Sequence, residues 1–248
     1  MISIIIPVYN EANTIGKLLS HIIDNSYKEN ISEIIVIDGG STDGTPEIVA
    51  SHINTEYKRS SIAKNSEKST HLIRFINSAK GRSVQMNLGA KNATGTILYF
   101  LHADSLPPKK FDRLIINEIE KGNLAGCFKM KFDHSHWWLR LASWLTRFEW
   151  RACRGGDQSQ FISRELFEDI GGFNEDFIIY EDNILINELY KRKQFVVIQE
   201  WITTSARLYE HKGIWNLQYH FWTIYVKRWF GASADDIYKY YCKHIASS

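Results

Sequence analysis

The sequence is poor in cysteine, and this excludes two kinds of protein. Its three cysteines, Cys127, Cys153 and Cys242, lie far apart, are odd in number and form no C-x-x-C pair. Disulfide frameworks and zinc sites need paired or closely spaced cysteines, so we expect neither and predict a reducing compartment. The formal charge is only +2, from 30 basic and 28 acidic residues. A chain this close to neutral is not expected to bind nucleic acid.

Long apolar runs are missing as well. No run approaches the roughly 18 to 20 residues that a membrane-spanning helix needs. The first nine residues, MISIIIPVY, have neither the basic start nor the cleavage site of a signal peptide. We therefore expect a cytoplasmic protein. Its 248 residues are enough for one α/β domain with a buried core.

Several common enzyme motifs are absent. No G-x-G-x-x-G follows the first apolar run, and the chain contains no G-x-x-x-x-G-K-[ST], which argues against dinucleotide-dependent dehydrogenases and P-loop enzymes. Serine hydrolases of the G-x-S-x-G kind are excluded in the same way. Residues 102–104 spell the string His-Ala-Asp, but no Asp-x-Asp nucleophile stands after the first run, as a dehalogenase would require.

What is present in the first half is an alternation of strand and helix patterns. Continuous β-branched runs predict strands buried on both faces, and apolar residues at helical spacing predict the helices between them. The predicted strands are 2–8, 33–38, 72–76 and 96–101, and the predicted helices include 15–23, 82–91 and 111–119. This order predicts an α/β fold with a doubly wound, mostly parallel sheet. Ligands bind such sheets beyond the carboxyl ends of the strands, where Glu11, Asp38 and Asp104 lie.

Two kinds of segment interrupt the alternation. Residues 51–70 are polar and weakly periodic, and we predict a surface excursion there. Residues 137–150 are rich in Trp and Arg and predict one aromatic helix, and residues 219–230 are a second stretch of this kind. Three interpretations stay open for these stretches: packing of the second half, aromatic platforms for a sugar ring, or basic helices resting on an anionic membrane.

Several motifs together resemble family 2 glycosyltransferases, and in particular a set of small, stand-alone bacterial members. The motifs are SIIIPVYNEA at 3–12, VIDGGSTDGT at 36–45, GRSVQMNLGA at 81–90, FLHADS at 100–105, GDQSQFI at 156–162, GGF at 171–173, YED at 180–182 and TTSAR at 203–207. Their order and spacing cover nearly the whole chain. The resemblance implies one GT-A domain over residues 1–248, with a nucleotide-sugar-binding half (1–105) and an acceptor-side half with C-terminal helices (106–248).

For the donor, the resemblance implies that Pro7, Tyr9, Glu11 and Asp38 hold the base and ribose. A carboxylate at Asp38 would accept the imide N–H of uracil, which favours a UDP-sugar, although many relatives carry two adjacent acids where this chain has Asp38-Gly39. An aspartate that only caps its own turn is the alternative for Asp38.

The family's Asp-x-Asp motif binds Mn²⁺ or Mg²⁺ together with the donor diphosphate. Here it reads His102-Ala-Asp104, so the resemblance implies Asp104 as the metal-facing carboxylate. His102, and His211 further on, are candidate ligands or ordinary surface histidines. Phosphate and ribose contacts are expected from a second group, namely Arg82, Asn87 and Arg207.

The resemblance implies that the acidic pair Glu181-Asp182 deprotonates the acceptor hydroxyl, with Asp182 as the base. An acidic pair that only stabilises a helix N-terminus is the alternative. Four residues are expected on the acceptor side, namely Trp137, Trp138, Asp157 and Gln158.

The implied activity is an inverting transfer to a hydroxyl of a saccharide or lipid-linked acceptor. Two other functions stay open: an inactive nucleotide- or carbohydrate-binding protein, and a sugar-nucleotide nucleotidyltransferase. The latter should carry a Gly-rich Arg/Lys phosphate loop near the first strand, and none is present.

Overall fold

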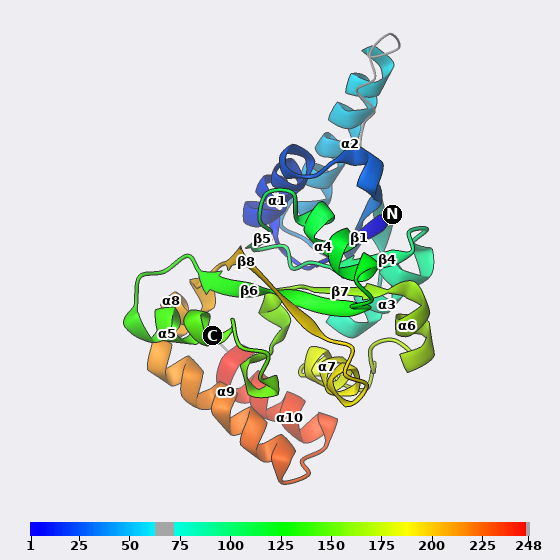
Figure 1. Ribbon diagram of the computed structural model, residues 1–248. Coiled ribbons are helices and arrows are strands. Elements are labelled where there is room, and N and C mark those ends of the chain that lie inside the picture. Colours follow the sequence, from blue (N-terminus) through cyan, green and yellow to red (C-terminus); the bar gives the residue numbers. More distant parts are fainter. Residues whose placement is uncertain (63–71, 247–248) are drawn as a thin grey trace.

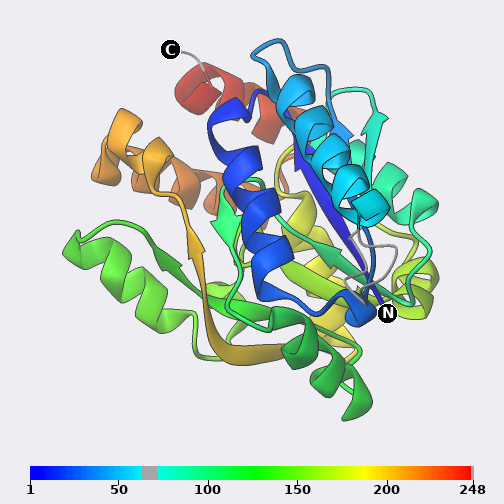
Figure 2. The ribbon, with the colours of Figure 1, turned by 90° about the horizontal axis from the view of Figure 1, so that it is seen from above.

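The computed structural model describes residues 1–62 and 72–246, in which eight strands form one sheet with helices on both faces (Figures 1 and 2). The strand order is β3-β2-β1-β4-β7-β6-β8-β5. The strands are β1 Ile2–Val8, β2 Ile31–Asp38, β3 Ile73–Asn77, β4 Ile97–Phe100, β5 Ser105–Leu106, β6 Ala125–Phe132, β7 Gln160–Ser163 and β8 Val196–Thr204. The α-helices are α1 Ala12–Asn25, α2 Thr45–Ile62, α3 Arg82–Asn92, α4 Phe111–Glu120, α5 Trp137–Leu145, α6 Arg164–Ile170, α7 Glu181–Lys191, α8 Arg207–Lys212, α9 Ile214–Trp229 and α10 Ala234–Tyr241.

The pairing confirms the predicted α/β class and its mostly parallel sheet. β1 pairs in parallel with β2 and β4, and β2 with β3, as the strand-helix alternation requires. The second half of the chain adds β7 antiparallel to β4 and β6, and β8 parallel to β6. The four predicted strands are all present, with ends that differ by one or two residues.

Each face of the sheet has its own core, and β1 contributes to both because its side chains alternate. Ile4 and Ile6 pack with residues of α1 and α4, whereas Ile5 packs with α3, α6 and α7. Gly89 lets α3 approach β1 closely, since a Cβ atom there would stand 2.4 Å from Ile5 Cγ2. This contact fixes α3 against the sheet and sets its first residue, Arg82, near the carboxyl end of β1.

A third, smaller core lies under the C-terminal helices. Leu217 and Ile224 of α9, Ile237 of α10 and Ile245 pack around Phe177, which precedes α7. The C-terminal helices are therefore anchored to the segment that leads into the predicted catalytic pair (Figure 1).

The predicted surface excursion over residues 51–70 is wrong for its first part, since residues 51–62 belong to α2. The core contacts of α2 come from its first turns, through Ile48, Val49 and Ile53, and the helix then projects from the sheet (Figure 1). A helix that leaves the core needs no apolar stripe, so its sequence lacks the period that would reveal it. Residues 63–70 lie outside the described residues.

The predicted aromatic helix over residues 137–150 is too long, because α5 ends at Leu145. The buried guanidinium of Arg154 donates to the carbonyls of Thr146 and Phe148, both at 2.6 Å. These bonds hold the chain in a turn that helical periodicity does not indicate. Within the described residues, no helix combines the length and apolarity needed to cross a membrane.

Candidate active site

The carboxyl ends of β1 and β2 form one edge of the candidate site. Asp38 is buried there and accepts hydrogen bonds from the N–H groups of Gly40 and Ser41, at 3.0 and 2.9 Å, and from the Ser41 hydroxyl. Asp38 therefore has the turn-capping role that the sequence left open, and contact with a base remains a prediction for it. Asp43 accepts from the N–H and hydroxyl of Thr45, which makes it a turn residue as well.

Tyr9 presents an exposed aromatic ring at the same edge. Its side chain is 41% exposed, and Lys80 Nζ lies 3.7 Å from the ring centroid in a cation–π contact. Pro7, half-buried, pairs with Ile37 one strand away. Lys80 was not predicted as a site residue, and the only signal for it in the sequence is its position next to Gly81 at the start of a helix.

Gln85 on α3 holds this edge in place. Its buried amide donates to the carbonyls of Val8 and Ile37, at 2.8 and 2.7 Å, and so links the ends of β1 and β2. Any Cβ on Gly39 would approach the Gln85 amide to 3.2 Å. Gln85 lies within the motif 81–90, yet its role depends on contacts between three elements that no local pattern reveals.

Arg82, at the start of α3, connects the edge formed by the ends of β1 and β2, which we call the donor edge after its predicted role, to the acidic pair. Its Nη1 lies 3.5 Å from Glu181 Oε1 and 3.8 Å from Asp182 Oδ2. Gly81 before it has φ 149°, a conformation that favours glycine. Tyr180, which precedes the pair, has φ 75°, a costly conformation for a bulky residue of the kind that concentrates at functional sites. The structure thus joins residues separated by about a hundred positions.

Further charged side chains from four elements meet the same place. Asp104, half-buried after β4, lies close enough to Asp157, Glu11, Arg207 and Arg82 for each to influence its charge. Burial first, then Asp157 and Glu11, raise the pKa of Asp104 to about 6, against the opposing effect of the two arginines. Glu11, directly before α1, forms an ion pair with Arg207, the first residue of α8. We call this group of side chains the charged cluster. It holds five carboxylates and two guanidinium groups, namely those of Glu11, Asp104, Asp157, Glu181, Asp182, Arg82 and Arg207.

The pair Glu181-Asp182 titrates far from its usual range. Glu181 is 1% and Asp182 is 8% exposed. Burial and the neighbouring Asp182 raise the pKa of Glu181, and Arg82 only partly offsets them. Burial also raises the pKa of Asp182, which Arg82 lowers and Asp157 raises. The pair therefore keeps a proton more readily than exposed carboxylates do.

The predicted metal ligands are only partly gathered. Asp104 lies among acids whose negative charge is not balanced, which suits a hard divalent cation accompanied by phosphate oxygens. His102 is half-buried next to it in the chain, whereas His211 is exposed on α8. In the residues that the structure describes, no group of three or more His, Cys, Asp or Glu side chains is arranged to hold a metal ion. The metal and its ligands remain predictions.

Two predicted residues are engaged in structural contacts. The Asn87 amide donates to the Phe173 carbonyl and to Glu175, and its oxygen accepts from the Phe173 N–H. The buried Gln158 amide donates to the Cys153 carbonyl at 2.9 Å and accepts from the Cys127 thiol. These bonds hold loops near the site. Neither side chain belongs to the charged cluster, whereas exposed Asp157, next to Gln158, does.

Trp137 and Trp138 begin α5 and meet α9. Their ring centroids lie 5.7 and 5.4 Å from that of Trp215, and Trp138 Nε1 donates to Gln218 at 3.0 Å. Trp137 is 59% exposed. An acceptor role for these two residues stays a prediction.

The mixed sheet, the helices on both faces and a charged cluster beyond the strand ends define a GT-A fold, and solved structures share it. The S. aureus protein TarS in complex with UDP aligns with a TM-score of 0.65, at 18% identity over 83% of this chain and 60% of that one. The mannosyltransferase PcManGT from Pyrobaculum calidifontis, in complex with GDP-Man and Mn²⁺, aligns with a TM-score of 0.65 at 20% identity, over 90% of this chain and 59% of that one.

The sequence model of glycosyl transferase family 2 matches residues 3–174, and the chain belongs to this family. Among curated relatives, glycosyltransferase AglE of Haloferax volcanii is 34% identical over 110 residues, which are 44% of this chain and 32% of the relative. The chain thus spans about a third of the length of that protein. The resemblance proposed from the sequence motifs is confirmed at the level of family and fold.

Proposed function

We propose that this protein transfers a sugar from a nucleotide sugar, with UDP as the favoured nucleotide, to an acceptor hydroxyl. The observation that carries the proposal is the charged cluster in which Arg82 lies between the donor edge and the pair Glu181-Asp182. Family membership supports the reaction class. The two structural relatives, in complex with UDP and with GDP-Man, support a nucleotide-linked donor.

We propose a single displacement with inversion. Burial raises the pKa of both acids, and we assign the negative charge of the pair to Asp182 because the motif resemblance implies this residue as the base. Asp182 takes the proton of the acceptor hydroxyl as the new bond to the anomeric carbon forms. The bond from that carbon to the diphosphate oxygen breaks, and the nucleoside diphosphate leaves with the electron pair.

Arg82 has two effects in this scheme. It lowers the pKa of Asp182 against burial, which keeps the base ionised, and it holds the carboxylate in one orientation. Arg207 is held by Glu11, and a diphosphate would compete with that carboxylate for the guanidinium. Mn²⁺ or Mg²⁺ bound by Asp104 would neutralise charge on the departing diphosphate.

A donor screen followed by a transfer assay tests the proposal. Nucleotide sugars that bind the folded protein should raise its melting temperature by mass action. The stabilising donor should then be consumed with release of the nucleoside diphosphate when saccharide or lipid-linked acceptors are added. Stabilisation without consumption in any acceptor mixture would favour the binding-protein alternative. No stabilisation by any nucleotide sugar would overturn the proposed donor class.

A further inference from the structure

Helix α9 has two apolar faces, of which the fold uses one. Leu217 and Ile224 are buried in the third core. On the opposite side, Trp215, Tyr219, Trp222, Val226 and Trp229 follow one another at intervals of four and three residues, and so lie within an arc of about 80° on a helix with 3.6 residues per turn. This second stripe runs along the whole helix and packs in no core cluster of the described residues.

The stripe is exposed and becomes more so toward the end of α9. Trp215 is 49% exposed, whereas Trp229 and the following Phe230 are 85% and 84% exposed. The ring contact of Trp137 with Trp215 extends the surface onto α5. We call this surface the aromatic face and define it by Trp137, Trp215, Tyr219, Trp222, Trp229 and Phe230. Continuous exposed apolar surface of this kind marks an interaction site.

The two segments of the chain that carry the aromatic face are rich in positive charge. Residues 137–154 and 207–230 together hold eight Lys and Arg but only two Asp and Glu, in a chain whose totals are 30 and 28. Arg151, Arg154 and Arg207 form hydrogen bonds or ion pairs within the protein, and Arg228 donates to the Ala232 carbonyl at 3.1 Å. The set is completed by Arg140, Arg147, Lys212 and Lys227.

Two of these cations lie along apolar groups. Lys227 Nζ lies 5.2 Å from the Tyr240 ring centroid, and the Arg228 guanidinium 5.2 Å from that of Phe177. In both contacts the charged end of the side chain lies over the ring, so these two side chains form cation–π contacts within the protein.

We propose that the aromatic face docks the protein on an anionic lipid bilayer, with α9 lying in the plane of the interface. Trp and Tyr rings are the side chains best suited to the boundary between headgroups and acyl chains, and basic residues beside them add attraction to anionic lipids. A second copy fits less well, because a twofold interface sets each patch against itself and would bring the cations of one copy against those of the other.

Docking in this way would bring the bilayer close to the candidate site. Tyr225, one residue before Val226, contacts Tyr180 with ring centroids 5.5 Å apart, and Tyr180 directly precedes the acidic pair. If the proposed function holds, the acceptor hydroxyl is then presented at the membrane surface. This consequence rests on the proposed function, whereas the docking itself does not.

The test is flotation of the full chain with vesicles of phosphatidylcholine alone or mixed with phosphatidylglycerol. The wild type should bind the mixed vesicles and lose binding as salt is raised. The double variant Trp229→Ser, Phe230→Ser should bind at least about tenfold more weakly, because two exposed apolar side chains are lost. The matched control is Leu72→Ser, which removes a side chain that is 56% exposed at the start of β3 and should leave binding unchanged.

A melting curve for each variant shows whether it is folded. If the double variant does not fold, Arg140→Glu combined with Lys212→Glu takes its place and should weaken binding to the mixed vesicles. Failure of the wild type to bind mixed vesicles, or equal binding to both kinds of vesicle, would overturn the proposal. So would equal binding by the wild type and the substituted protein. A wild-type dimer that the double variant dissolves would assign the face to a second copy instead.

Discussion

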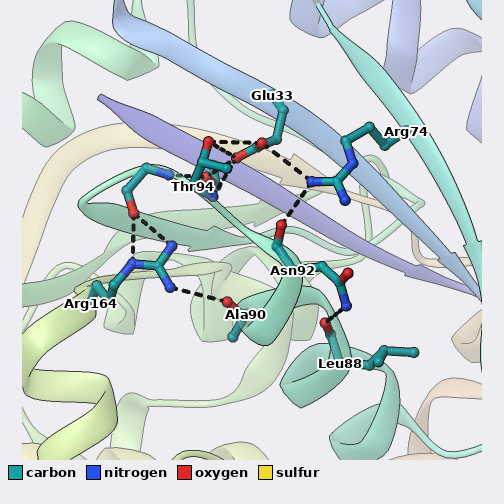
Figure 3. A network of polar contacts seen from close by, with 9 residues as sticks. Glu33, Arg74, Leu88, Ala90, Asn92, Thr94 and Arg164 are labelled. Carbon is teal, nitrogen blue, oxygen red and sulfur yellow. Dashed lines mark hydrogen bonds and ion pairs between the residues drawn. The ribbon is translucent and has the colours of Figure 1, made fainter.

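Two buried glutamates at opposite ends of the sheet differ in the number of hydrogen bonds and ion pairs that their carboxylates receive. Glu33 on β2 is 2% exposed and Glu181 at the start of α7 is 1% exposed, so their burial is matched. Glu33 accepts hydrogen bonds from the Ser3 hydroxyl and from the N–H and hydroxyl of Thr94. Arg74 adds an ion pair at 3.5 Å (Figure 3). Glu181, in contrast, faces a single guanidinium at 3.5 Å, and its Oε1 accepts no hydrogen bond.

The surroundings decide the charge of each group. Burial would raise the pKa of Glu33, but the bonds from Ser3 and Thr94 and the charge of Arg74 outweigh it, and the net shift is downward. Burial and Asp182 raise the pKa of Glu181 in spite of one arginine. A carboxylate that the fold uses for architecture is fully satisfied, whereas one left under-satisfied can hold and release a proton near neutral pH.

The Glu33 network also joins elements that carry the site at their other ends. Arg74 donates to the Asn92 carbonyl at 2.7 Å, and Arg164 donates to the carbonyls of Ala90 and Gly95 (Figure 3). The end of α3 and the start of α6 are thus fixed at the amino end of the sheet. Arg82, at the other end of α3, is positioned by this anchoring.

The strongest test of the comparison is Asp182→Asn, which should lower turnover by about 10²- to 10⁴-fold, because it removes a positioned general base. Donor affinity should change little, since Asp182 contacts the acceptor hydroxyl and not the nucleotide in the proposed scheme. The measurements are donor affinity and transfer rate with the acceptor found in the screen.

The matched variant is Glu181→Gln, which should be the milder of the two. Near-normal turnover by Asp182→Asn would contradict the assignment of the base. A larger loss from Glu181→Gln would move the role to Glu181.

The opposite behaviour is expected at the amino end. Glu33→Gln should destabilise the protein by about 3 kcal/mol, because it leaves Arg74 and the surrounding donors without their buried anion. Turnover per folded molecule should change far less than in Asp182→Asn, since Glu33 contacts no site residue and the bond from Arg74 to the Asn92 carbonyl, which anchors α3, does not involve the Glu33 side chain. Urea unfolding, together with turnover at a temperature where the variant is folded, measures both. An intact unfolding midpoint would show that the network is dispensable.

The sequence predicts the strands of the sheet better than the contacts that the buried charged side chains make. The strands 2–8, 33–38, 72–76 and 96–101 are buried on both faces and carry a clear apolar signal, so their place in the sheet follows from local pattern. Motif resemblance likewise places Asp104 and Glu181-Asp182 at the functional end. The length of α2 and the turn held by Arg154 are missed, because neither depends on apolar periodicity.

Contacts between distant elements are a further limit. Three contacts are of this kind: Arg82 pairs with Glu181, Gln85 links two strands, and Asn87 holds the Phe173 loop. Each joins residues about 50 to 100 positions apart. Such contacts form only when elements that are distant in the sequence pack against one another. A single sequence shows only that each residue is polar and near a helix start.

A further substitution, Asp104→Asn, removes the negative charge of the predicted metal ligand. The variant should lose the gain in UDP affinity that Mn²⁺ gives the wild type, a change of about tenfold that corresponds to 1.4 kcal/mol. Its metal-free affinity should be retained, because the neutral side chain keeps its shape. Calorimetry of UDP binding with and without Mn²⁺ measures both. An equal response to Mn²⁺ in the two proteins would remove Asp104 from the metal site.

The smallest expected effect concerns the pH dependence of stability, and its sign differs between the two glutamates. The folded-state pKa of Glu181 is raised, so the stability linked to its protonated form is fully present below the unfolded pKa and is lost as pH rises through the folded pKa. Glu181→Gln removes this loss and should gain stability relative to the wild type as pH rises, by on the order of 1 kcal/mol.

The pKa of Glu33 is lowered, so its contribution to stability is present above the unfolded pKa and is lost only as pH falls through the folded one. The advantage of the wild type over Glu33→Gln should therefore shrink on acidification. The measurement is urea unfolding of the wild type, Glu181→Gln and Glu33→Gln over a series of pH values, which gives for each protein the slope of the free energy of unfolding against pH. Because Glu181 and Asp182 titrate as a pair, the slope at that end belongs to both residues. Equal slopes for Glu181→Gln and the wild type would show that Glu181 ionises as readily in the folded chain as in the unfolded one, and the contrast between the two ends of the sheet would then be one of geometry alone.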